Sequence, residues 1–178
     1  MKLKKVIKNC CYWKEINDLA VEAFPPEEYL APDNLIEMSK KDCFDFYYIE
    51  DKNAFIGFVV IQTYKNISYL FFLAIAKEYR SKGYGGKTLQ LIKETYPNKT
   101  QIVDFEMVDV NSSNYNQRIK RREFYLKNGY HETGLFLSYL GVDYEVFCSS
   151  NNTFDEDAFK ELMTHINVEG FNPKYFKK

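Results

Sequence analysis

The chain has 178 residues and a net charge of −1, with hydrophobic and charged fractions of 46% and 28%. This length suits one domain with its own buried core, so we expect residues 1–178 to form a single domain. The charge balance gives no electrostatic basis for nucleic-acid binding, and no apolar run approaches the roughly 18 residues of a membrane span. The basic first residues lack the apolar core of a secretory signal, which predicts a cytoplasmic protein.

The four cysteines and two histidines are scattered along the chain. Their spacing lacks the Cys-x-x-Cys pairs that are typical of structural zinc sites. We therefore expect a protein without a metal.

In the first half of the chain, a helical spacing of apolar residues is followed by a strand-like spacing. Apolar residues at helical spacing predict an amphipathic helix over "KEINDLAVEAFPP", which Pro25 and Pro26 end. A shorter helix over "DNLIEMSKK" is expected to have Asp33 as its N-cap. Strand-like alternation then predicts an antiparallel meander of three strands joined by short turns, over "CFDFYYIE", "AFIGFVVIQTY" and "ISYLFFLAIA".

The second half alternates strands and helices. A glycine-rich stretch leads from the third strand into a helix over "KTLQLIKETY", and "TQIVDFEMV" predicts the next strand. A helix over "NQRIKRREFYLKN" is closed by Gly129, and a hairpin turns around Gly141. A final helix is expected to open with a capping box from Thr153 to Glu156. This order predicts a mixed α/β fold, with helices on both faces of the sheet.

The glycine-rich stretch "YRSKGYGGKTL" suits an anion, because glycines let backbone N–H groups approach a ligand at the start of a helix. A Walker A loop would need a glycine at the position of Ser81. A dinucleotide-binding fingerprint would need its third glycine at Thr88, early in a βαβ unit. Neither spacing fits, so both nucleotide-binding designs are excluded.

The remaining pattern is Arg80, Gly83 and Gly85 at a strand-to-helix junction, and it resembles motif A of the GNAT family of N-acetyltransferases. Further on, "REFYLKNGY" resembles motif B of that family, with the aromatic pair Phe124 and Tyr125. The two motifs occur in the family's order, and the resemblance covers about residues 44 to 148. It implies a twisted, mostly antiparallel mixed sheet that is splayed open at the cofactor site.

The resemblance implies acetyl-CoA as co-substrate. Backbone N–H groups of the loop would bind its pyrophosphate, from the residues Arg80, Ser81, Lys82, Gly83, Tyr84, Gly85 and Gly86. On the preceding strand, Leu73, Ala74 and Ile75 would pair with the pantetheine arm, and the N–H near Ile75 would face the thioester carbonyl. Asn116 and Arg118 are the cofactor-contacting candidates of the later helix, whose basic run is equally consistent with a solvated surface.

Tyr125 matches the position of the family's frequent general acid. A tyrosine with a pKa of about 10 stays protonated at neutral pH and can donate a proton to the departing thiolate. Tyr69 stands where some family members have a glutamate, which removes the carboxylate from that position. Glu106 and Asp109 are then the candidate bases, directly or through a water, although each is equally consistent with a solvated strand-end charge.

We therefore expect an acetyl-CoA-dependent N-acetyltransferase that transfers its acetyl group directly to a primary amine of a small molecule or peptide. A non-catalytic CoA-binding or protein-interaction module on the same fold is the alternative. Neither nucleic acid nor a membrane is expected as a partner. A homodimer remains open, and the sequence does not identify the acceptor.

Overall fold

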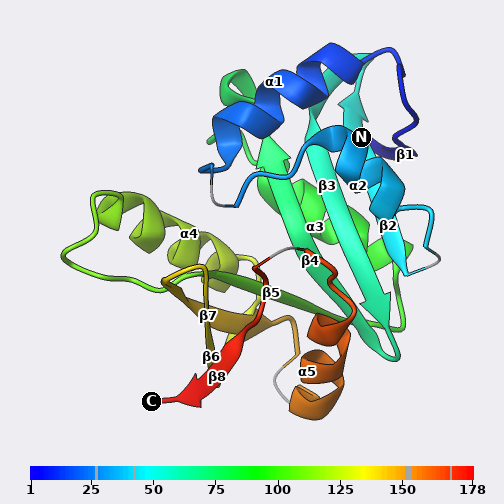
Figure 1. The fold of residues 1–178 in the computed structure, drawn as a ribbon. Coiled ribbons are helices and arrows are strands. Elements are labelled where there is room, and N and C mark those ends of the chain that lie inside the picture. The colour runs from blue at the N-terminus through cyan, green and yellow to red at the C-terminus, as the bar shows by residue number, and fades with distance from the viewer. Residues whose placement is uncertain (27, 42, 151–153, 169) are drawn as a thin grey trace. The chain divides into compact units, whose positions relative to one another are not determined.

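The structure is a computed structural model that describes residues 1–178 except residues 27, 42, 151–153 and 169 (Figure 1). Its described residues form five α-helices and an open, mostly antiparallel sheet of eight strands. This confirms the predicted mixed α/β fold. The chain divides into two compact units, the first made of Met1–Thr63 and Leu70–Pro97 and the second of Tyr64–Tyr69 and Asn98–Lys178. Each unit is described by itself.

The strands of the first unit follow one another in chain order, and the last two also extend into the second unit. They are β1 (Lys2–Lys5), β2 (Phe44–Asp51), β3 (Ala54–Tyr64) and β4 (Ile67–Ile75). The β1–β2 and β2–β3 pairs are antiparallel, and a two-residue turn joins β3 to β4. The predicted meander is confirmed, whereas β1 was not predicted because its mostly exposed sequence "KLKK" has no apolar alternation.

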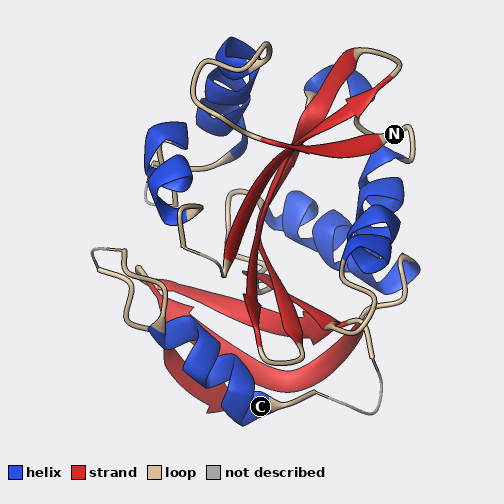
Figure 2. Ribbon diagram, turned by 90° about the vertical axis from the view of Figure 1, so that its right-hand side faces the viewer, coloured by secondary structure: helices blue, strands red, loops and turns tan. Residues whose placement is uncertain are grey.

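The helices of the first unit cover both sides of its strands. They are α1 (Trp13–Ala23), α2 (Pro32–Met38) and α3 (Tyr84–Thr95), with a short 3-10 turn, η1 (Lys77–Tyr79). Figures 1 and 2 show α1 and α2 on one side of these strands and α3 on the other. The prediction that Asp33 caps α2 is wrong, because Ala31 is the N-cap and Pro32 the first helical residue. Proline suits that position, where its missing N–H would have no partner.

Gly57 allows β3 and β4 to approach closely in the segment that was predicted to bind pantetheine. A Cβ atom built on Gly57 would lie 2.0 Å from the carbonyl oxygen of Ala74, a distance that no side chain tolerates. Ala74 is buried, whereas its neighbours Leu73 and Ile75 are partly exposed. The backbone of this part of β4 is therefore fixed by a glycine on the neighbouring strand.

The second unit includes the last residue of β3 and the first three residues of β4, Ile67 to Tyr69. Its other strands, in the order in which they pair, are β5 (Thr100–Glu106), β7 (Val142–Cys148), β6 (His131–Tyr139) and β8 (Lys174–Lys177). The β4–β5 ladder is parallel and pairs Ile67–Tyr69 with Thr100–Ile102, and the remaining pairs are antiparallel. The β6–β7 hairpin turns at Leu140 and Gly141, as predicted, and β8 was not predicted.

The helices α4 (Tyr115–Lys127) and α5 (Glu156–Thr164) cover opposite faces of this second set of strands. Tyr125 of α4 stacks on Phe105. Phe159 of α5 packs against Tyr69, whose hydroxyl donates a hydrogen bond to Asp104. Successive strand residues such as Asp104 and Phe105 point to opposite faces of a sheet. We call these the α4 face and the α5 face of the second unit.

The start of α5 differs from the prediction. Asp155 is the N-cap, and its carboxylate accepts a hydrogen bond of 2.9 Å from the N–H of Ala158. The capping box from Thr153 to Glu156 is therefore wrong, since Glu156 is the first helical residue, and Thr153 lies outside the described residues. An aspartate satisfies the first helical N–H groups as well as a threonine does.

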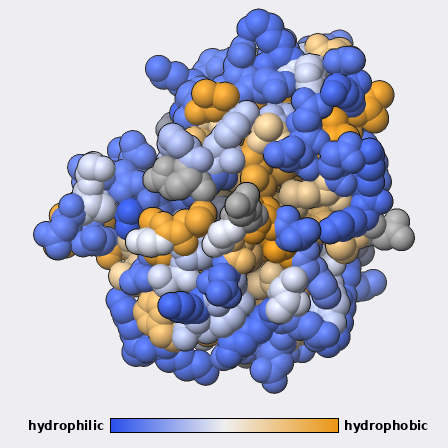
Figure 3. Space-filling view, viewed as in Figure 1, coloured by the Kyte–Doolittle hydropathy of each residue, from blue (hydrophilic) through white to orange (hydrophobic). Residues whose placement is uncertain are grey.

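Hydrophilic side chains cover much of the face shown in Figure 3. Among the described residues, the exposed large apolar side chains are far apart in the sequence, two of them in α1 and α4 and three in loops: Val21, Leu126, Ile7, Val110 and Leu140. Among the helices in the described part of the chain, none is long and apolar enough to cross a membrane.

Candidate functional site

The first unit contains the glycine-rich loop, which leads from the end of β4 into α3 through η1. Gly83 is the N-cap of α3 and has a φ of 81°, a left-handed conformation that favours glycine. The helix begins at Tyr84, so Gly85 and Gly86 belong to its first turn. The helix predicted over "KTLQLIKETY" is thus present and begins three residues earlier, at Tyr84 instead of Lys87.

The backbone N–H groups of Ser81 to Gly86 have no hydrogen-bond partner within the described chain. A helix leaves its first N–H groups unpaired, and no side chain caps this one. Because the positive end of the helix dipole lies at the same place, the loop is a ready-made site for an anion. The Thr88 hydroxyl donates to the carbonyl of Tyr84 at 2.9 Å, so it does not act as a Walker threonine.

Arg80 fixes the beginning of this loop. Its Nε donates to the carbonyl of Ile75 at 2.8 Å, and its guanidinium pairs with Glu22 of α1 at 2.8 Å. Its own backbone N–H donates to Lys77. Arg80 was predicted to contribute its N–H group to the pyrophosphate site, but that group is already used within the protein. The open row of N–H groups therefore starts at Ser81.

In the second unit, Tyr125 lies on the α4 face and is 6% exposed. Its ring stacks on Phe105 at 5.1 Å between centroids, and Phe124 and Tyr130 pack against its edges. Burial raises the pKa of the Tyr125 hydroxyl above its ordinary value, so this group stays protonated at neutral pH. It makes no hydrogen bond to any residue that the structure describes.

Glu106, at the end of β5, is held by cationic and amide groups. Its carboxylate pairs with Arg118 at 2.8 Å and Arg121 at 2.9 Å, and it accepts from Asn114 at 3.0 Å. Burial alone would raise the pKa of Glu106, but these three partners outweigh it and the pKa falls below its ordinary value. A carboxylate stabilised in this way is a weaker base. The other candidate, Asp109, accepts from the N–H of Asn111 at 2.9 Å.

The predicted cofactor residues of α4 have contrasting surroundings. Arg118 is mostly buried and donates to Asn114, to the carbonyl of Met107 and to Glu106. Asn116 is exposed in the first turn of the helix. The guanidinium of Arg118 is thus part of a network within the protein, and the amide of Asn116 lies at the surface.

Asp104 is a polar residue that the sequence reasoning did not single out. Its carboxylate accepts from the hydroxyl of Tyr69 at 2.5 Å and from that of Tyr139 at 3.1 Å. Burial, followed by the charge of Asp104, raises the pKa of Tyr69 well above its ordinary value. Tyr69 was noted for lacking a carboxylate, and the structure places one on the adjacent strand. The parallel pairing of β4 with β5 was the missing information.

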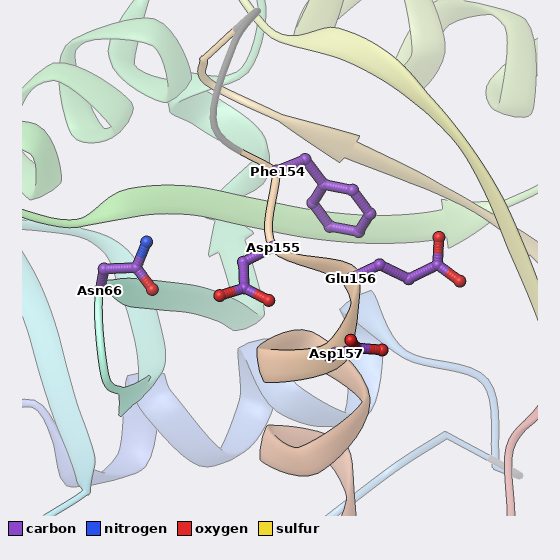
Figure 4. A pocket seen from close by; sticks show the side chains of 5 residues that line it. All are labelled: Asn66, Phe154, Asp155, Glu156 and Asp157. Carbon is purple, nitrogen blue, oxygen red and sulfur yellow. The ribbon is translucent and has the colours of Figure 1, made fainter.

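An open pocket in the second unit is lined by none of the predicted site residues. Figure 4 shows it lined by Asn66 from the β3–β4 turn and by residues 154–157 at the start of α5. Asp155 caps the helix, and Glu156 pairs with Lys160 and Lys177. These two carboxylates serve the packing of α5.

Comparison with known proteins assigns the family. A family model described as an acetyltransferase (GNAT) domain matches residues 42–132, which is 91 of the 178 residues. The chain belongs to the GNAT acetyltransferase family. The matched segment includes the glycine-rich loop, Glu106 and Tyr125.

Solved structures share the fold at low sequence identity. A GNAT-family acetyltransferase from Bacteroides thetaiotaomicron has a TM-score of 0.74 and 19% identity, with 97% of this chain and 99% of that chain covered. An aminoglycoside 6'-N-acetyltransferase in complex with coenzyme A has a TM-score of 0.65 and 16% identity, covering 88% and 100%. The corresponding enzyme from Enterococcus faecium gives 0.62 and 14%, again covering 88% and 100%. No curated protein sequence matches the chain.

Proposed function

We propose that the protein is an acetyl-CoA-dependent N-acetyltransferase that moves the acetyl group directly to a primary amine. The observation that carries this proposal is the row of unpaired N–H groups from Ser81 to Gly86 at the start of α3. In a chain of this family, a diphosphate is the anion that such a row would bind. We regard residues 1–178 as one acetyltransferase domain that acts in the cytoplasm, as the sequence predicts.

The loop N–H groups would bind the pyrophosphate, and Leu73, Ala74 and Ile75 would pair with the pantetheine arm. Attack by a neutral amine forms the C–N bond and breaks the C–S bond. Tyr125 then protonates the departing CoA thiolate and regains a proton from the amide nitrogen. Its buried, protonated hydroxyl without a partner in the described chain supports this role. It also favours an enzyme over the non-catalytic alternative.

The predicted roles of the other residues differ in their support. Asn116 is exposed and stays a candidate for cofactor contact. The ion pairs of Glu106 and the three contacts of Arg118, to Asn114, Met107 and Glu106, favour structural roles for both residues. An amine of small size is a reasonable acceptor, since structural neighbours include aminoglycoside and spermidine N-acetyltransferases.

Ligand-induced thermal stabilisation tests cofactor binding. A ligand that binds the folded state alone stabilises it by about 2.7 kcal/mol at a hundredfold excess over its Kd. Acetyl-CoA should raise the melting temperature, and the rise should grow with the logarithm of this excess, whereas ATP with magnesium should not. Equal shifts with both ligands, or none with either, would refute the proposal. Free-thiol release from acetyl-CoA with a panel of amines then identifies the acceptor.

A further inference from the structure

Arg121 lies one helical turn before Tyr125 on α4, the helix that carries the proposed general acid. Residues four apart on a helix are neighbours on its surface. Long helical side chains also tilt toward the N-terminus of their helix, over the preceding turn. The phenol of Tyr125 therefore extends toward the guanidinium of Arg121.

The end of β5 holds both of these side chains. The ring of Tyr125 stacks on that of Phe105 at 5.1 Å between centroids. The next residue of the strand, Glu106, accepts a hydrogen bond from Nη1 of Arg121 at 2.9 Å. Because two consecutive strand residues bind the ring and the guanidinium, the two groups are kept at the same turn of α4.

The guanidinium of Arg121 has donors to spare. A guanidinium carries five N–H donors, and the bond to Glu106 is the one polar contact of the Arg121 side chain within the described chain. This side chain is 39% exposed. Arg118 differs, since it donates to Asn114, Met107 and Glu106. Arg121 can therefore keep its ion pair and still stabilise a second anion.

The charge of Arg121 already acts on the Tyr125 hydroxyl. Burial raises the pKa of this hydroxyl, Arg121 lowers it, and Asp104 of β5 raises it. The other carboxylate at this end of β5, Glu106, is paired with Arg121. Tyr130, which packs against the edge of the Tyr125 ring, stays neutral because burial raises its own pKa. Arg121 thus favours the ionised form of Tyr125 against its other surroundings.

We propose that Arg121, held by Glu106, is a positioning residue that stabilises the phenolate left on Tyr125 after it has protonated the CoA thiolate. This inference rests on the proposed function. In that step the O–H bond of Tyr125 breaks, an S–H bond forms on CoA, and the negative charge moves from sulfur to the phenol oxygen. Arg121 stays protonated, and Tyr125 becomes neutral again when it takes a proton from the acetylated nitrogen. A buried phenolate without a nearby cation would be costly, so Tyr125 would be a weaker acid without Arg121.

Fluorine NMR of a labelled Tyr125 tests this role without an acceptor. In the full chain, 3,5-difluorotyrosine replaces Tyr125, since its fluorines make the phenol far more acidic and bring its ionisation to a pH at which the protein stays folded. Arg121→Gln should raise the ionisation midpoint by about one pH unit, the size expected for losing a neighbouring cation. Arg121→Lys keeps the charge and should stay near the midpoint of the labelled parent protein. Lys120→Gln removes a charge from an exposed position of α4 and should leave the midpoint unchanged.

Three outcomes would overturn the proposal: an unchanged midpoint in Arg121→Gln, an equal rise in Lys120→Gln, or an equal rise in Arg121→Lys. Melting curves of the unlabelled proteins with acetyl-CoA separate this inference from the proposed function. If acetyl-CoA stabilises the protein and the midpoint does not move in Arg121→Gln, the role of Arg121 alone is refuted. If the midpoint moves and acetyl-CoA has no effect, the acetyltransferase assignment is refuted.

Arg121→Met keeps the test valid if Arg121→Gln does not fold. Glu106 retains Arg118 and Asn114 as partners in either variant. The methionine also covers much of the surface that lies under the stem of the arginine, so packing is preserved while the charge is lost. The same rise of the midpoint is expected. An unchanged midpoint in this variant would show that the cation of Arg121 does not act on Tyr125.

Discussion

The glycine-rich loop of the first unit and the start of α4 in the second were both predicted to contact the cofactor. Their polar groups differ in whether they have hydrogen-bond partners within the protein. In the loop, the backbone N–H groups from Ser81 to Gly86 have no partner among the described residues. At the start of α4, Arg118 donates to Asn114, Met107 and Glu106. A group that the protein leaves unpaired is available to a ligand, whereas a satisfied group costs free energy to redirect.

The largest expected effect concerns Tyr125, whose hydroxyl resembles the loop in having no partner in the described chain. Tyr125→Phe keeps the stacking on Phe105 and removes the proton donor. Turnover should fall by about 10²-fold or more, because general acid catalysis contributes effects of that size. Acetyl-CoA affinity should change little, which a binding titration checks alongside single-turnover kinetics. Unchanged turnover would remove Tyr125 as the acid.

Gly85→Val tests the loop itself. A branched side chain in the first turn of α3 would enter the space in front of the open N–H groups. Loss of one or two charge-assisted hydrogen bonds should weaken acetyl-CoA binding about tenfold to a hundredfold. Gln90→Val is the matched control, since it places the same side chain on an exposed position of the same helix. Equal affinities in the two variants would mean that the loop does not hold the cofactor.

Arg118→Gln tests the other half of the comparison. This change leaves the carboxylate of Glu106 with one cationic partner fewer, so the free energy of unfolding should fall by about 2 kcal/mol. Acetyl-CoA affinity should stay close to that of the wild type. Lys120→Gln, at an exposed position of α4, controls for the lost charge. A large loss of affinity with unchanged stability would instead restore Arg118 as a cofactor ligand.

Local patterns in the sequence predicted most of the fold. Helical and alternating spacing located the meander, α1, α3 and α4, and the glycine spacing located the start of α3. The edge strands β1 and β8 were missed because "KLKK" and "KYFK" are only four residues long and begin and end with lysine. They become strands by pairing with β2 and β6.

The chemistry of the site depends on contacts between distant residues, and the sequence predicted it less well. Glu106 looked like a candidate base until its pairing with Arg118 and Arg121 was visible. The hydrogen bond between Asp104 and Tyr69 could not be predicted, because it depends on the pairing of β5 with β4. Residue type and helical spacing do not encode such pairings, since they depend on strand order and register.

The smallest expected effect is the pH dependence of stability that Glu106 contributes. Its pKa in the folded protein is lowered from 4.5, so its ion pairs stabilise the fold above that pH and lose their effect as the pH falls through the folded value. Glu106→Gln should therefore be less stable than the wild type by about 2 kcal/mol at pH 7, and this difference should shrink in acid. Glu123→Gln, which breaks an exposed pair with Lys127 on the same helix, should change stability by about 0.5 kcal/mol or less. Denaturant titrations of the three proteins between neutral and acidic pH provide the measurement. If the Glu106→Gln difference stayed constant with pH, the network at the start of α4 would not depend on this charge.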